Sequence, residues 1–194
     1  ETTQRLIVMS ATLDDVAVAG LLGTDTPIVR SEGRSFPVAI EYLGTGLPVL
    51  PGGPDAPERI VAAATRRALR ETDGDVLVFL PGAAEIRRVQ EMLETAPEVV
   101  EDGVSLRRLY GELDPREQEL ALAASPHGPR RVILATNIAE TSVTLPGIRA
   151  VVDSGLVRRA VFDPVSGMSR LETQRISRAS AEQRAGRPGR VAAG

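Results

Sequence analysis

Short apolar runs alternate with segments of helical spacing through the middle of the chain, and this alternation limits the folds open to it. The spacing predicts strands at 75–80, 104–110, 130–136 and 148–154, and helices at 57–70, 84–93 and 115–124. Parallel strands need long crossover connections, which are usually helices. The sequence therefore predicts an α/β fold, with an open, mostly parallel sheet flanked by helices on both faces.

Three further elements lie outside this alternation. The apolar run RLIVMS at 5–10 predicts a strand buried on both faces. A helix is predicted at 13–22, with acidic residues in its first turn. The stretches LVRRAVFDP and MSRLETQRIS, joined by VSG, predict a β-hairpin over 156–175 that is appended to the sheet. Between the early elements and the sheet lies a stretch rich in proline and glycine, predicted to be a loop or linker.

The charge of the chain is unevenly distributed. The net charge is −3, yet the segment from Arg149 to Arg190 holds nine arginines and four acidic residues. A basic segment in an acidic protein is typical of a surface that binds a polyanion. The sequence has no cysteine, which excludes disulfides and thiolate metal sites and is compatible with a reducing cytosol. It also has no long apolar run or signal-peptide pattern, so we expect a cytoplasmic protein that does not enter a membrane.

Three segments carry candidate chemistry, and each has a simpler alternative. SAT at 10–12 follows a predicted strand, where it could serve only to cap a helix. ATNIAETSVTLPG at 135–147 brings short hydrogen-bond donors to the carboxyl end of a predicted parallel strand, where open α/β sheets bind ligands. The alternative for this segment is an ordinary polar loop.

The third segment, EQRAGRPGR at 182–190, is the most basic. We predict a helix capped by Ser180, on which Gln183, Arg187 and Arg190 share one face. Arg184 would point elsewhere and play a structural part. The alternative is a solvated, charged helix end.

Taken together and in this order, SAT, TNIAETS and QRxGRxGR resemble the superfamily-two helicases of the DEAH/RHA group. VLVFLPGAAEI at 76–86 and RLYGELDPREQ at 108–118 are similar to further motifs of that family. SEGRSFPVAIEYL at 31–43 makes the chain most similar to bacterial HrpB-type members. The resemblance covers essentially the whole chain and implies a RecA-like fold. It implies that residues 1–27 are the tail of a first RecA-like domain and that residues 28–194 are the second.

The resemblance also implies roles for individual residues. Gln183 would position the attacking water or the γ-phosphate, and Arg187 and Arg190 would act as arginine fingers in ATP hydrolysis. Nucleotide-side contacts would come from Ser10, Thr12, Thr141, Ser142 and Gly186. Contacts to the nucleic-acid strand would come from Gly82, Tyr110, Gly111, Thr136 and Asn137. The hairpin 156–175 resembles the element that wedges against an incoming duplex.

The expected cofactor is ATP with Mg²⁺, and the expected partners are single-stranded RNA or DNA and the first RecA-like domain. The sequence has no GxxxxGK[ST] stretch and no DEAH stretch, so the Mg²⁺ ligands are expected in that first domain. We therefore expect a fragment of an ATP-dependent helicase that is inactive alone. A non-catalytic RNA-binding module that retains the RecA-like fold is the alternative.

Overall fold

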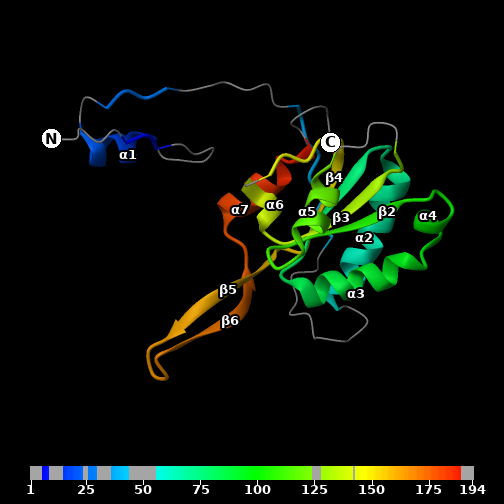
Figure 1. The fold of residues 1–194 in the computed structure, drawn as a ribbon. Coiled ribbons are helices and arrows are strands. Elements are labelled where there is room, and N and C mark those ends of the chain that lie inside the picture. The colour runs from blue at the N-terminus through cyan, green and yellow to red at the C-terminus, as the bar shows by residue number, and fades with distance from the viewer. Residues whose placement is uncertain are drawn as a thin grey trace. The chain divides into compact units, whose positions relative to one another are not determined.

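The computed structural model describes residues 6–8, 15–23, 26–29, 36–43, 56–123, 128–141 and 143–188 (Figure 1). The chain divides into two compact units, Glu1–Arg34 and Ser35–Gly194. The first unit contains α1 (Asp15–Leu22), which confirms the helix predicted at 13–22 over its described residues. The predicted domain boundary after residue 27 falls within this first unit, and the assignment of 1–27 to another RecA-like domain stays a prediction.

The predicted strand at 5–10 is not formed in the part of it that the structure describes. Leu6, Ile7 and Val8 belong to no strand and their side chains are exposed. A strand that is apolar on both faces needs neighbouring strands and two covering layers to be stable. The described residues of the first unit contain no strand that could pair with it.

The second unit is built on a four-stranded parallel sheet. Its strands are β1 (Asp75–Phe79), β2 (Ser105–Leu109), β3 (Arg131–Ala135) and β4 (Ile148–Asp153). Their order is β2-β3-β1-β4, and each neighbouring pair is parallel. The sheet confirms the predicted α/β class, and each of these strands lies within its predicted range.

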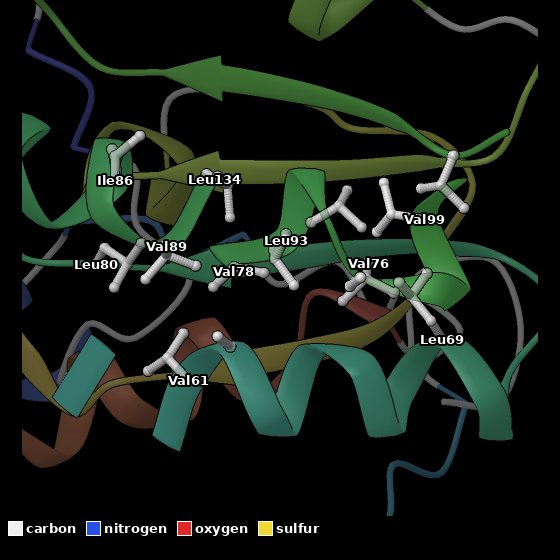
Figure 2. Packing of buried hydrophobic residues seen from close by; sticks show 14 residues of the cluster. Val61, Leu69, Val76, Val78, Leu80, Ile86, Val89, Leu93, Val99 and Leu134 are labelled. Atoms are coloured by element: carbon white, nitrogen blue, oxygen red, sulfur yellow. The ribbon is translucent and has the colours of Figure 1, made fainter. Parts of the chain in front are cut away.

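Helices cover both faces of this sheet because the two central strands are apolar on both sides. Val76 and Val78 of β1 face α2 (Pro57–Glu71) and α3 (Ala83–Glu94) in one buried cluster (Figure 2). Leu77 and Phe79 belong to a second cluster, which includes residues of α5 (Pro115–Leu122) and α6 (Ile138–Thr141). Two short helices, α6 and α4 (Pro97–Val100), were not predicted. Each has four residues, too few to show a helical period.

An ion pair joins the two central strands where they begin. Arg131 donates from Nε and Nη2 to Oδ2 of Asp75, at 2.9 and 2.6 Å, and its backbone N–H donates to Oδ1 at 2.8 Å. Nη2 also donates to the carbonyl oxygen of Pro146 at 3.0 Å. Several hydrogen bonds to one buried guanidinium offset the cost of removing it from water. The clamp fixes the amino edge of the sheet, the edge opposite the one described below.

The appended hairpin is also confirmed. β5 (Leu156–Asp163) and β6 (Met168–Arg175) pair antiparallel in full register from Leu156↔Arg175 to Asp163↔Met168. The connecting turn is ordered by Asp163, which accepts hydrogen bonds from the Val165 N–H and the Ser166 hydroxyl. Figure 1 shows the hairpin extending away from the sheet. After it the chain enters α7 (Arg178–Ala185).

Replacing Leu134 by Ala should lower the free energy of unfolding by about 2–5 kcal/mol, because it opens a cavity in the packed core. Leu134 lies in the middle of β3, fully buried among residues of β1 and α3 (Figure 2). Leu120→Ala is the matched control, since Leu120 lies on α5 with 55% of its surface exposed. It should change stability by less than about 0.5 kcal/mol. Urea unfolding followed by circular dichroism measures both, and equal effects would contradict this description of the core.

Glu98 on α4 gives a pH-dependent prediction. The Arg66 guanidinium, which donates to Glu98 at 2.9 and 3.3 Å, lowers the pKa of this carboxyl from 4.5 to about 2. A carboxylate with a lowered pKa stabilises the folded chain above its unfolded pKa, and this contribution is lost as the pH falls through the folded pKa. The unfolding temperature of Glu98→Gln should therefore lie below that of the parent chain at pH 7. The difference should shrink between about pH 4.5 and pH 2, and a constant difference would refute the assignment.

Candidate functional site

The carboxyl edge of the sheet gathers the loops that follow neighbouring strands. Three backbone hydrogen bonds tie each loop to the next strand: Leu80 N–H to Ala135 O at 2.8 Å, Thr136 N–H to Leu109 O at 3.1 Å, and Ser154 N–H to Phe79 O at 3.1 Å. The loops after β2, β3 and β1 therefore lie in a row. This row contains all five residues predicted to contact a nucleic-acid strand, Gly82, Tyr110, Gly111, Thr136 and Asn137.

The five residues differ in how they meet solvent. Gly111 and Asn137 are exposed, Tyr110 and Thr136 are half-buried, and Gly82 is buried. Gln118 of α5 fixes the backbone of the loop after β2, which contains Gly111. Its amide nitrogen donates to the carbonyl oxygens of Gly111 and Leu113 at 3.2 and 3.0 Å. This end of the row therefore has a fixed backbone and an open surface.

A buried guanidinium links this edge to α7. Arg184 is 1% exposed, and its Nε donates to Glu140 of α6 at 2.9 Å while its Nη1 donates to Asp153 at the end of β4 at 2.9 Å. Nη1 also reaches the Leu156 carbonyl at 3.3 Å, at the root of the hairpin. The guanidinium carbon lies 4.6 Å from the centre of the Phe79 ring, a cation–π contact. Arg184 lies at the centre of this cluster, which agrees with the structural role predicted for it.

Ser180 supports the same cluster instead of capping the helix. Its hydroxyl donates to Glu140 at 2.7 Å, so both carboxylate oxygens of Glu140 are bound from α7. The helix cap is Ser177, whose side chain accepts a hydrogen bond from the Ser180 N–H at 3.1 Å. The prediction of a cap at Ser180 is wrong by three residues. Ser177 and Ser180 lie three residues apart and are nearly equal candidates for the cap, and the hydrogen bond from Ser180 to Glu140 decides between them.

Arg187 lies just beyond α7 and not on it. The helix ends at Ala185 with Gly186 as its C-cap, so helical periodicity does not govern the direction of Arg187. The Arg187 side chain is buried, and its Nη1 donates to the carbonyl oxygen of Val143 at 2.6 Å. Val143 belongs to the segment after α6, so Arg187 joins the two segments that the sequence singled out, 135–147 and 182–190.

Neither the backbone conformation nor the described surroundings of position 186 require a glycine there. Its φ is −77°, which any residue adopts, and a Cβ there would meet only the carbonyl oxygens of Glu182 and Gln183 at 3.4 and 3.7 Å. Both distances are ordinary contacts. Gln183 is half-buried in the last turns of α7, beside this position.

The chain matches the model of the helicase conserved C-terminal domain over residues 58–192. The chain belongs to this family. The ATP-dependent RNA helicase HrpB of Escherichia coli is 49% identical over 98% of the chain, and a probable ATP-dependent RNA helicase, a DHX35 homolog of Caenorhabditis elegans, is 39% identical over 98%. The chain spans 22% and 27% of the lengths of these relatives.

Solved structures agree with the sequence matches. The crystal structure of the E. coli DEAH/RHA helicase HrpB superimposes with a TM-score of 0.82 at 49% identity, covering 96% of this chain and 22% of that one. A second structure, of the E. coli DExH-box NTPase HrpB, gives a TM-score of 0.81. These matches confirm the DEAH/RHA resemblance and the RecA-like fold of this helicase C-terminal domain.

Several predicted site residues of this helicase domain lie outside the described residues, namely Ser10, Thr12, Ser142 and Arg190. Thr141 is described only as the last residue of α6. The roles of all the predicted site residues stay predictions. Within the described ranges no helix is long and apolar enough to cross a membrane.

Two acids of the helicase domain were missed by the sequence reasoning. Glu140 stands inside TNIAETS, and Asp153 ends a strand, so each looks like a solvated acid when read alone. The available signal was the presence of an arginine in α7 beside a segment predicted to lie at the same sheet edge. A buried arginine requires anionic partners, and Glu140 and Asp153 are two acids that follow or end strands at that edge.

Replacing Arg184 by Ala should lower the free energy of unfolding by about 3–5 kcal/mol, because Glu140 and Asp153 lose the counter-charge that they share. Arg178→Ala is the matched control, since Arg178 is exposed at the start of the same helix. It should change stability by less than about 0.5 kcal/mol. Chemical denaturation measures both variants. A loss below about 1 kcal/mol for Arg184→Ala would show that the cluster is replaceable.

Proposed function

We propose that this helicase C-terminal domain is the second motor domain of an ATP-dependent helicase acting on nucleic acid, with RNA as its substrate. In this proposal it supplies arginine fingers for ATP hydrolysis and part of the track that holds a single strand. The observation that carries the proposal is the Arg187–Val143 hydrogen bond, because it joins the segment expected to touch phosphate to the segment expected to touch the strand.

The row of loops at the carboxyl edge supports the track. Open parallel sheets bind ligands at this edge, and the exposed Gly111 and Asn137 offer backbone and amide groups to a passing strand. Contacts from such groups to phosphate and ribose give affinity without sequence preference. The relatives whose names state an RNA helicase activity support RNA as the nucleic acid.

The chemistry of the third segment supports the ATP-facing role. Arg187 and Arg190 would stabilise the charge that builds on the transferring phosphoryl group, and Gln183 would orient the attacking water. A planar guanidinium matches phosphate oxygens better than an ammonium does. Gly186 supports a close approach, since nothing in the described part of this chain demands a glycine there.

Mg²⁺ would not be bound by this domain in the proposal. The described residues contain no group of three or more acidic or histidine side chains placed to hold a metal ion. The first RecA-like domain would supply the Mg²⁺ ligands and the phosphate-binding loop, and it would bind ATP together with Thr141, Ser142, Ser10 and Thr12. We infer that such a protein acts in the cytoplasm, and that this chain alone does not hydrolyse ATP.

The test uses a protein that carries this chain together with the first RecA-like domain. Arg187→Ala and Arg190→Ala should each lower the RNA-stimulated kcat for ATP hydrolysis by about a thousandfold or more, as expected for lost arginine fingers. Binding of single-stranded RNA should be retained, as measured by fluorescence anisotropy. Arg178→Ala, on the exposed start of α7, should leave both properties unchanged.

Hydrolysis that survives both substitutions unchanged would refute the motor proposal. If the unsubstituted protein binds RNA and hydrolyses no ATP, the alternative of a non-catalytic RNA-binding module is supported instead. If Arg187→Ala also abolishes RNA binding and lowers stability, its contact with Val143 is structural and the finger role is wrong.

A further inference from the structure

The hairpin is attached to the α/β body by an ion pair near its root. Arg158 of β5 donates from Nη2 to Oε1 of Glu85 at 3.0 Å, and Glu85 lies in the first turn of α3. The two side chains are 32% and 14% exposed, so the contact is partly shielded from water. The hairpin's other ion pair, Arg170 with Glu172 at 2.7 Å, lies within β6 and does not reach the body.

Gly82 makes room for this ion pair. A Cβ at position 82 would lie 2.8 Å from Nη1 of Arg158, 3.2 Å from its Cζ and 3.1 Å from Oε2 of Glu85. The φ of Gly82 is −166°, an extended backbone that any residue adopts, so its conformation does not require glycine. What the glycine provides is space, because a Cβ at position 82 would force the flexible end of the Arg158 side chain to shift. A side chain at position 82 would occupy the volume that holds the Arg158 guanidinium.

We propose that Gly82, Glu85 and Arg158 form a clasp that fixes the angle of the hairpin against the carboxyl edge of the sheet. Arg158 is then a positioning residue for strand separation, a statement that rests on the function proposed above. Gly82 acts through Arg158 in this arrangement. Its burial beneath the guanidinium argues against the direct nucleic-acid contact that the sequence predicted for it.

A second arginine extends the clasp across the body. Arg88 of α3 lies 3.8 Å from Oε1 of Glu85 and also pairs with Glu58 in the first turn of α2. Glu85 therefore stands between two guanidinium groups, one from the hairpin and one from its own helix. Neutralising Glu85 would remove the carboxylate that both guanidinium groups share, while Arg88 keeps Glu58, so Arg158 and the hairpin lose this attachment.

The first test measures the hairpin angle in this chain without reference to any activity. The sequence has no cysteine, so spin labels can be placed at Val165→Cys in the hairpin turn and Val100→Cys on α4 alone. These side chains are 95% and 64% exposed, so labelling should not disturb packing. Pulsed electron–electron double resonance then gives the distribution of distances between the label on the hairpin and the label on the body.

Glu85→Gln, Arg158→Ala and Gly82→Ala should each raise the population of displaced hairpin about fivefold, the size expected for one lost ion pair. Arg170→Ala, which breaks an ion pair inside the hairpin, is the matched control and should leave the distribution unchanged. The decisive variant is Gly82→Ala in an Arg158→Ala background. It should add nothing, because the guanidinium that the new methyl group would displace is already gone.

The proposal is overturned if Gly82→Ala broadens the distribution equally with and without Arg158, or if none of the three substitutions changes it. Circular dichroism should show that each variant remains folded. A variant that unfolds is replaced by Arg158→Gln, which keeps most of the side-chain volume and removes the charge.

The second test addresses strand separation in a protein that carries both RecA-like domains. Arg158→Ala should lower the number of base pairs opened per ATP about fivefold while the RNA-stimulated rate of hydrolysis is retained. Equal coupling in the two proteins overturns the positioning role. Absence of any hydrolysis or unwinding in the unsubstituted protein refutes the proposed function instead, and the distance measurements on the clasp are independent of that result.

Discussion

A single buried charge holds together the elements that meet at the carboxyl edge of the sheet. Arg184 comes from α7, Glu140 from α6 and Asp153 from β4, and the same guanidinium reaches the backbone of β5. α7 adds no residue to the second buried cluster, whereas Ala139 of α6 packs there with Ile148 of β4, so the ion pairs are the main link between α7 and the sheet. Removing one partner from such a cluster strands a charge in a site shielded from water. The relative placement of three functional segments thus depends on one arginine.

Two arginines of the segment 182–190, Arg184 and Arg187, have different surroundings. Arg184 forms ion pairs with carboxylates inside the domain, while Arg187 donates a hydrogen bond to the backbone of the segment that follows α6. Neighbouring arginines with the same chemistry therefore differ in the partners described here, which are two carboxylates for Arg184 and a backbone carbonyl for Arg187.

Much of the sheet could be predicted from the sequence, and the reason is physical. The central strands are apolar on both sides, so their positions follow from composition, and amphipathic helices mark the crossovers between them. The errors occur where a local pattern depends on something distant. Residues 6–8 look like a buried strand only if neighbouring strands exist, and Ser180 looks like a cap only if no carboxylate competes for its hydroxyl.

The site was predicted in part for the same reason. The sheet rule placed the segment 135–147 at the carboxyl edge, while the five candidate contacts to a nucleic-acid strand came from the family resemblance. The direction of the Arg187 side chain could not be predicted from helical spacing, since the helix ends before this residue. Nor could the pairing of Arg158 with Glu85 be predicted, because 73 residues separate them in the sequence and only the fold brings β5 beside the first turn of α3.

The length of the hairpin gives its attachment a mechanical meaning. Each strand has eight residues. Eight residues of extended chain span about 27 Å, so a rotation of about 10° at the root would move the tip by about 5 Å. In the function proposed above, the root of the hairpin lies beside the path of the nucleic-acid strand, and the hairpin would act as a lever. A sub-ångström adjustment in the body, too small to disturb the packed sheet, would therefore become a displacement at the tip comparable to the size of a base.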